Sequence, residues 1–449
     1  MILECGAATL LFAGISIVSM YAQKITLIRY WDSDEYYWMT YNMATHQPIR
    51  ASAPWVDRIL VPWLSSFPSR YFLTRGYGYE VIVYPYYVIN VTAALLATWL
   101  LIVWLRRFVE SRAIRLLVVA LFLAEWHGPT RFVYFYPMYV DPPFIVFLLG
   151  GLMLIDSSHG RAPERISPLL TLICVLGTLC RESMILIPLT FIVAHNPLTA
   201  GPRKWRWRRD LPAVAAPLVA WLLALTFAHA VVTPKSPYSA IEAALTVSKK
   251  KPVFTWALAW FFTFGPGVVA EICADAKRAR QFLRDSPHLA FYLIACGVLG
   301  FIGGTDTERV LFWARPVVYV LAARAAEQHW NVLTNGLLLT VLGLAQMISE
   351  RILWDIPNVL TSPTAFRDVG SLRASLYTAL NRTIVMDDYY WNLWSFFGSR
   401  PWHALLLAYD VLFVVAIVAW TRRLARRPSP QRQTQQPPVP PVVQPLQSL

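Results

Sequence analysis

The chain has 449 residues, of which 56% are hydrophobic and only 15% charged, and its net charge is +14. Soluble domains carry about 25% charged residues, so this composition excludes an ordinary soluble enzyme and favours a polytopic helical membrane protein. A strongly basic chain suggests nucleic acid as a partner. The arginines, however, gather between apolar segments, which indicates basic cytoplasmic loops, and we expect no nucleic-acid partner.

About twelve apolar segments follow one another along the chain, at roughly 5–22, 81–105, 113–126, 137–155, 168–181, 183–195, 211–232, 253–273, 288–303, 310–325, 332–349 and 403–420. With the N-terminus in the cytoplasm every inside loop is basic, as the positive-inside rule requires. We therefore predict an all-α protein of about twelve transmembrane helices over residues 1–425. It would lie in the lipid bilayer of a bacterial inner (plasma) membrane with both termini cytoplasmic.

Two long loops and a tail complete the predicted organisation. The first extracytoplasmic loop, 23–80, contains two candidate helices lying in the membrane interface, one starting near Ser33 and the other near Pro54. The last extracytoplasmic loop covers 350–402. The cytoplasmic tail, 426–449, is rich in proline and glutamine and is predicted to be disordered.

The first loop begins with three acids in four residues: Asp32, Asp34 and Glu35, flanked by tyrosine and tryptophan. Acids at a membrane boundary stay in water or find partners, because their desolvation is costly. Asp32 can act as a helix N-cap and Glu35 can complete a capping box with it. This leaves Asp34 without a local role, so Asp34 is the first candidate for a catalytic acid and Asp32 the second.

Further charged residues lie at the predicted outer ends of spans. Each of them, taken alone, is explained by a helix cap or a structural ion pair. Together they gather at one membrane depth, which is the stronger signal. The N–H donors of an arginine guanidinium group match the spacing of phosphate oxygens. A carboxylate beside such a phosphate could act as a general base. The predicted donor-phosphate and substrate-binding residues are Arg58, Arg181, Arg309, Arg315, Glu35, Asp141, Glu182 and Asp306.

This interpretation requires no cofactor with certainty, but it leaves open whether a divalent cation is bound. Asp32, Asp34 and Glu35 are also a candidate ligand set for Mg²⁺ or Mn²⁺, because both ions prefer oxygen ligands. The residues leave the need for a metal undecided.

These features resemble the GT-C superfamily of integral membrane glycosyltransferases, which holds the protein O-mannosyltransferases, aminoarabinose transferases and GPI mannosyltransferases. The similar features, spread over roughly the first 330 residues, are Asp32-Ser-Asp34-Glu35 after the first span, the two interfacial helices, and the placements of Asp141, Arg181-Glu182 and Asp306…Arg309. The resemblance implies a catalytic acid in the first loop, a polyprenyl-phosphate-linked sugar as donor, and inversion at the anomeric carbon. A large soluble C-terminal domain is not expected, which leaves open whether the acceptor is a glycan, a lipid or a protein.

Two other functions fit parts of the pattern. An O-antigen-type polysaccharide polymerase or ligase also uses outer arginines and a lipid-linked glycan, and it would have a large late loop such as 350–402. A lipid or solute transporter would show inverted repeats and broken helices with charges near the membrane midplane. No repeat of spans is visible in the sequence.

Overall fold

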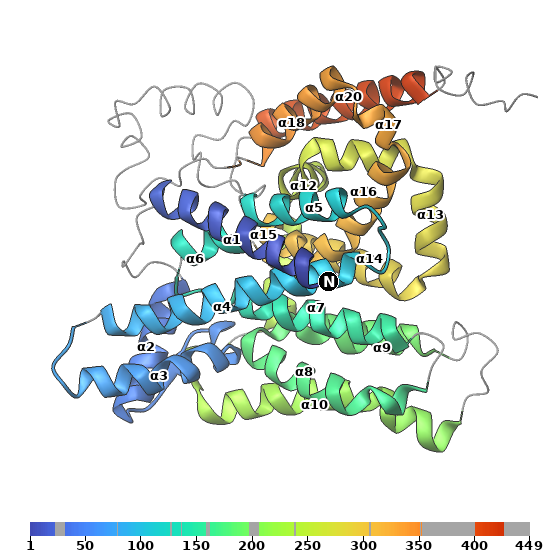
Figure 1. The fold of residues 1–449 in the computed structure, drawn as a ribbon. Coiled ribbons are helices and arrows are strands. Elements are labelled where there is room, and N and C mark those ends of the chain that lie inside the picture. The colour runs from blue at the N-terminus through green and yellow to red at the C-terminus, as the bar shows by residue number, and fades with distance from the viewer. Residues whose placement is uncertain are drawn as a thin grey trace, which may run out of the picture.

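The computed structural model describes the chain except for residues 23–31, 79, 126–127, 136, 159–161, 197–205, 238, 305–306, 351, 353–399 and 426–449. The described part is almost entirely helical (Figure 1). Its α-helices are α1 (Ile2–Ala22), α2 (Asp32–Thr45), α3 (Leu60–Leu73), α4 (Glu80–Leu105), α5 (Arg112–Ala124), α6 (Pro129–Phe135), α7 (Asp141–Ser158), α8 (Ser167–Cys180), α9 (Leu186–Ala194), α10 (Trp207–Val231), α11 (Ala240–Lys250), α12 (Val253–Ala274), α13 (Ala276–Asp285), α14 (Pro287–Ile302), α15 (Thr307–Leu311), α16 (Arg315–Gln328), α17 (Trp330–Leu333), α18 (Gly336–Ser349) and α20 (Arg400–Ala425). Four short 3-10 helices, η1 (Trp55–Asp57), η2 (Pro163–Arg165), η3 (Glu182–Ile185) and η4 (Phe312–Ala314), and two short strands, β1 (Arg50–Ala51) and β2 (Thr233–Pro234), connect them.

Each of the twelve predicted apolar segments overlaps a helix, but the helices differ in length. Among the described residues six are long and apolar enough to cross a membrane, namely α1, α4, α7, α10, α12 and α20, and α13 with α14 gives a seventh if that bent pair is one span. The other segments form helices of 16 residues or fewer, such as α5 with 13 residues and α8 with 14. A span needs about 20 residues, so the structure supports a multi-pass helical membrane protein with six to seven clear spans.

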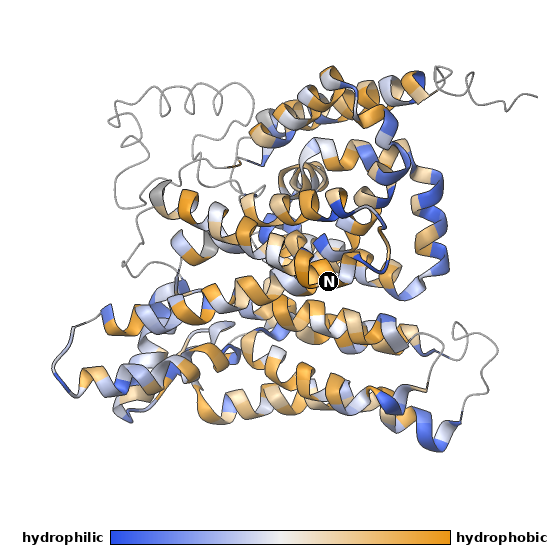
Figure 2. Ribbon diagram, in the orientation of Figure 1, coloured by the Kyte–Doolittle hydropathy of each residue, from blue (hydrophilic) through white to orange (hydrophobic). Residues whose placement is uncertain are grey.

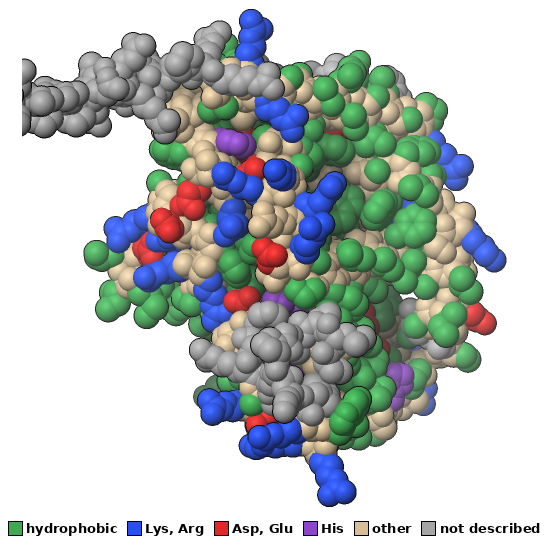
Figure 3. All heavy atoms as spheres, turned by 90° about the vertical axis from the view of Figure 1, so that its right-hand side faces the viewer, with side chains coloured by type: hydrophobic (Ala, Val, Ile, Leu, Met, Phe, Trp, Pro, Cys, Tyr) green, Lys and Arg blue, Asp and Glu red, His purple; other side chains and the backbone are tan. Residues whose placement is uncertain are grey.

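The two ends of the helix bundle differ in charge. Asp141 opens α7, and Asp156 near the other end of the same helix pairs with Arg107 after α4. Around that second end lie exposed basic side chains of the α4–α5 loop, of α13, of Arg324 in α16 and of the last turn of α20. Figure 3 faces this end and shows the concentration of lysine and arginine. Helix α13 is mainly hydrophilic in Figure 2 and meets α14 at 109°.

The first loop forms the opposite end of the bundle. Helix α2 begins at Asp32, which confirms the predicted start near Ser33. The second helix begins at Leu60 rather than near Pro54, because η1 ends at Asp57 and Arg58 leaves the helical conformation with ψ 60°. Helix α3 exposes an aromatic stripe of Trp63, Phe67 and Tyr71, as expected for a helix at the headgroup level.

A two-residue parallel pairing fixes this loop to the segment after α10. Strand β1 pairs with β2 through Arg50 opposite Thr233 and Ala51 opposite Pro234. The next residue, Lys235, forms an ion pair with Glu35 of α2 at 2.8 Å. The segment that follows a distant span therefore holds the start of the first loop in place.

Helix α12 is broken in its middle, where Gly265 has φ of +75° and precedes Pro266. The break leaves carbonyl groups without helical partners. Arg315 donates to the Thr263 carbonyl at 2.6 Å, and the Gln346 side-chain amide donates to the Phe264 carbonyl at 2.8 Å. The positive charge of Arg315 also stabilises the negative dipole end of the first half-helix. Two side chains from later helices therefore satisfy the broken backbone.

Gly265→Ala is expected to destabilise the protein by about 1–3 kcal/mol, because an alanine at positive φ is strained. Its Cβ would also overlap the Gln346 amide that satisfies the break. Gly14→Ala in α1 is the matched control, since nothing lies within 4 Å of a Cβ there. The measurement is the thermal unfolding midpoint of both variants in detergent. Equal midpoints would show that the break tolerates a side chain.

Candidate functional site

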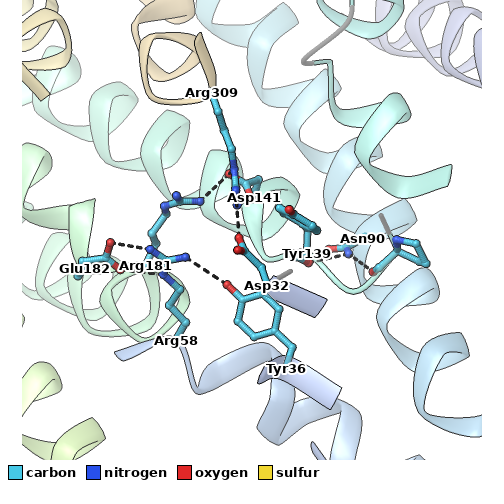
Figure 4. Close-up of polar contacts among 10 residues, drawn as sticks. Asp32, Tyr36, Arg58, Asn90, Tyr139, Asp141, Arg181, Glu182 and Arg309 are labelled. Carbon is cyan, nitrogen blue, oxygen red and sulfur yellow. Dashed lines mark hydrogen bonds and ion pairs between the residues drawn. The ribbon is translucent and has the colours of Figure 1, made fainter. Parts of the chain in front are cut away.

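Asp141 lies at the centre of a buried ion-pair network at the first-loop end of the bundle (Figure 4). Arg309 of α15 donates to both Asp141 carboxylate oxygens, at 3.2 and 2.7 Å, and Arg181 at the end of α8 donates to one of them at 2.7 Å. Arg309 also donates to Asp32 of α2 at 3.0 Å. One guanidinium therefore joins acids from the first loop and from α7.

A second pair continues the same network. Arg58 forms a bidentate ion pair with Glu182, with N–O distances of 2.9 and 2.8 Å, and donates to the Tyr36 hydroxyl at 3.3 Å. Tyr36 lies one helical turn after Asp32, so both side chains are on the side of α2 that meets the arginines. Arg58, Arg181 and Arg309 together balance the charges of Asp32, Asp141 and Glu182.

Neighbouring polar and aromatic side chains hold the guanidinium groups in place. The Asn90 amide of α4 donates to the carbonyls of Pro137 and Tyr139, at 2.6 and 2.8 Å, and so fixes the segment that leads into α7. The Tyr139 ring lies 4.4 Å from the Arg309 guanidinium carbon, and the Trp313 ring lies 4.9 Å from that of Arg181. These cation–π contacts stabilise the charges where water is excluded.

The three acids of the first loop have different environments. Asp32 contacts Arg309, with its side chain 16% exposed, and Glu35 binds Ser52 and Lys235 at 2.9 and 2.8 Å instead of closing a capping box. The predicted capping box is therefore absent, because both acids have tertiary partners. Asp34 is half-buried, and two residues along a helix place it about 200° around the axis from Asp32.

The structure brings together six of the predicted site residues and places others elsewhere. Arg58, Arg181, Arg309, Asp141, Glu182 and Asp32 form the network. Arg315 lies in a separate buried cluster, where it pairs with Glu125 at 2.5 Å and contacts the break in α12. Asp306 lies outside the described residues.

Tyr36, Tyr139 and Asn90 are the participants that sequence reasoning missed. The signal for Asn90 was its position as an amide inside an apolar helix, where an unpaired polar group is costly. The one-turn spacing of Asp32 and Tyr36 was a second signal.

Two of the three first-loop acids that are candidate metal ligands have basic partners in the structure. Asp32 and Glu35 are bound to Arg309 and Lys235, and the helix directs Asp34 away from Asp32. No group of three metal-ligating side chains occurs among the described residues. The possible use of Mg²⁺ or Mn²⁺ by these acids stays a prediction.

Burial dominates the protonation of groups at the edge of the network. It raises the pKa of Tyr36 to about 12, against the opposing charge of Arg58, so Tyr36 stays a neutral phenol. Burial and then the charge of Glu182 raise the pKa of Asp57 to about 6, although His229, 2.8 Å away, and Arg58 lower it. Asp57 therefore loses its proton at a higher pH than an ordinary aspartate.

Asp57 is expected to make stability fall as pH rises. Its folded pKa, about 6, exceeds the ordinary value of 3.8, so its contribution is fully present below pH 3.8 and is lost as pH rises through 6. Asp57→Asn should therefore reduce the difference in unfolding midpoint between pH 4.5 and pH 7.5. His229→Gln is the control: a pH dependence that disappears in that variant but persists in Asp57→Asn would assign the titration to the histidine.

Comparison with known protein families, with curated proteins and with solved structures finds no significant match. The interpretation of the site therefore depends on its own geometry.

Proposed function

We propose that this chain is a membrane glycosyltransferase of the GT-C type. It would move a sugar from a polyprenyl-phosphate donor to a hydroxyl of a glycan, lipid or protein acceptor on the extracytoplasmic face, with inversion. The supporting observation is that three buried arginines form ion pairs with three acids from distant segments of the chain. These ion pairs lie at the end of the bundle away from the basic loops. A lipid-linked phosphate would present itself at such a boundary.

The contacts of Arg309 suggest how it would exchange a carboxylate partner for the donor phosphate. Arg309 holds Asp32 through a single 3.0 Å contact, whereas Asp141 binds the same guanidinium twice. A donor phosphate would replace Asp32 on Arg309, because its oxygens match the guanidinium donors and Asp141 keeps the side chain in place. Asp32 would then be released as a carboxylate beside the phosphate.

The bond changes follow from this exchange. The acceptor hydroxyl oxygen bonds to the anomeric carbon from the face opposite the phosphate, and the bond between that carbon and the phosphate oxygen breaks. The phosphate keeps the electron pair, and its added charge is stabilised by the arginines. The proton of the hydroxyl goes to the released carboxylate, which acts as general base. Asp34, half-buried on the same helix, stays the alternative base.

Arg181→Lys and Arg309→Lys should each weaken donor binding, because lysine keeps the charge and loses the two-pronged contact. We expect a decrease of about 10-fold for each, the size of one charge-assisted hydrogen bond. The measurement is binding of polyprenyl-phosphate sugars to the protein in nanodiscs. Arg107→Lys, at the basic end, is the control. Unchanged donor affinity in both variants would make these arginines structural.

Transport is the second candidate function, and the broken helix α12 is the observation that favours it. Discontinuous helices with buried charges beside them line substrate sites in transporters. Here Arg315 and Glu125 lie beside the Gly265 break. Movement of a lipid-linked sugar across proteoliposomes without glycosidic transfer would favour transport over the transferase.

A further inference from the structure

The basic end of the bundle holds one acid among three arginines, at the start of α1. Glu4 is only 2% exposed and forms ion pairs with Arg115, Arg106 and Arg112. Arg115 is itself buried, and it donates to the Val109 and Glu110 carbonyls at 2.6 Å each. Glu4 and Arg115 therefore form the inner, structural part of the cluster.

The two outer arginines are less completely engaged. The Nε atoms of Arg106 and Arg112 lie 3.5 and 3.6 Å from the Glu4 carboxylate, beyond good hydrogen-bond distance, and their side chains are 39% and 59% exposed. One carboxylate cannot neutralise three guanidinium groups. Glu110 and Glu327 add two acids beside this loop, since the Glu327 carboxylate accepts from the backbone N–H groups of Glu110 and Ser111. Arg324, and Arg107 with its partner Asp156, also lie there, so five arginines stand against four acids and the region keeps a net positive charge.

An apolar stripe begins one residue before Glu4, about 100° around the axis of α1, and runs along the exposed side of the helix. Leu3, Leu10 and Ile17 follow at seven-residue intervals on one helix face and are 75%, 75% and 67% exposed. A ligand that fits both features carries a negative head and a long apolar tail. Basic groups between helices at a membrane surface bind such headgroups.

We propose that the Glu4 cluster and the exposed face of α1 form a binding site for one anionic phospholipid. Arg106 and Arg112 bind its phosphate, and its acyl chain lies along Leu3, Leu10 and Ile17. Glu4 aligns the arginines and keeps their mutual repulsion low when no lipid is bound. This site is independent of the proposed transferase activity, because it lies at the other end of the bundle from Asp141.

The test compares lipid retention in nanodiscs of phosphatidylcholine with and without phosphatidylglycerol, followed by native mass spectrometry. The wild-type chain should retain phosphatidylglycerol in preference. Each basic residue near a surface contributes about 5-fold, so Arg106→Gln with Arg112→Gln should reduce this preference by about 25-fold. The lysine pair at the same positions should keep most of it, because the charge is kept.

The matched control is Arg422→Gln with Arg423→Gln, which removes the same charge from exposed residues in the last turn of α20. The control should retain the wild-type preference. An equal loss in this control would overturn the proposal, because it would show general attraction to a basic surface. Inorganic phosphate in phosphatidylcholine nanodiscs is the final arm. If phosphate stabilises the chain as much as phosphatidylglycerol does, and only when Arg106 and Arg112 are present, the site binds free anions and the lipid assignment is wrong.

Discussion

Asp32→Asn should remove most of the glycosyl transfer that we propose, with a decrease of about 10²–10⁴-fold in turnover, the usual contribution of a general base. The asparagine keeps the shape of the side chain and a carbonyl oxygen for Arg309, but it cannot accept the proton. Donor binding should therefore change much less than turnover. The measurement is single-turnover transfer from a polyprenyl-phosphate sugar in proteoliposomes, alongside donor affinity.

Asp34→Asn is the matched comparison, since it makes the same chemical change two residues along α2. We expect the smaller loss there, because Asp32 accepts at 3.0 Å from the guanidinium that would bind the phosphate, whereas Asp34 lies about 200° around the helix axis from Asp32. The reverse ranking would make Asp34 the base and leave Asp32 as a group that positions Arg309. If the wild-type chain transfers no sugar from any donor tested, the proposed function itself is wrong.

Asp141→Ala should have the largest effect on stability, with an expected loss of about 3–5 kcal/mol, because breaking a buried ion pair leaves uncompensated charge. Asp141 is 3% exposed and binds both Arg309 and Arg181, so its removal leaves two buried guanidinium groups facing each other. The unfolding midpoint in detergent and the yield of folded protein would measure the change.

Asp156→Ala provides the control on the same helix. It also removes an aspartate paired with an arginine, but Arg107 is 31% exposed and water can solvate it, and the second partner of Asp156, the buried His288, lies farther away at 3.5 Å. The expected cost is about 0–1 kcal/mol. A loss for Asp141→Ala no greater than this would mean that water or bound lipid solvates the network, and that the site is more open than the described packing indicates.

The sequence by itself was sufficient for the features that depend on local pattern. Apolar segments identified the membrane class, and the grouping of arginines distinguished the two ends, because both depend on the composition of short stretches. The start of α2 at Asp32 followed from acids placed after an apolar run. The sequence also identified the charged residues that lie near one end of the bundle, because charged residues are rare within apolar segments.

Only the tertiary structure decided which of those charges meet. Asp32 and Arg309 are 277 residues apart, and their contact depends on how α2, α7 and α15 pack. The capping argument that favoured Asp34 used only neighbours in sequence, whereas Arg309 of α15 and Lys235, which follows β2, bind Asp32 and Glu35 from distant parts of the chain. Arg315 shared the residue type and apparent depth of Arg309, but it binds elsewhere, to the Thr263 carbonyl at the helix break beside Gly265. Which charges form an ion pair depends on the distance between them in space, because their attraction weakens with distance. The hydropathy pattern along the chain contains no information about that distance.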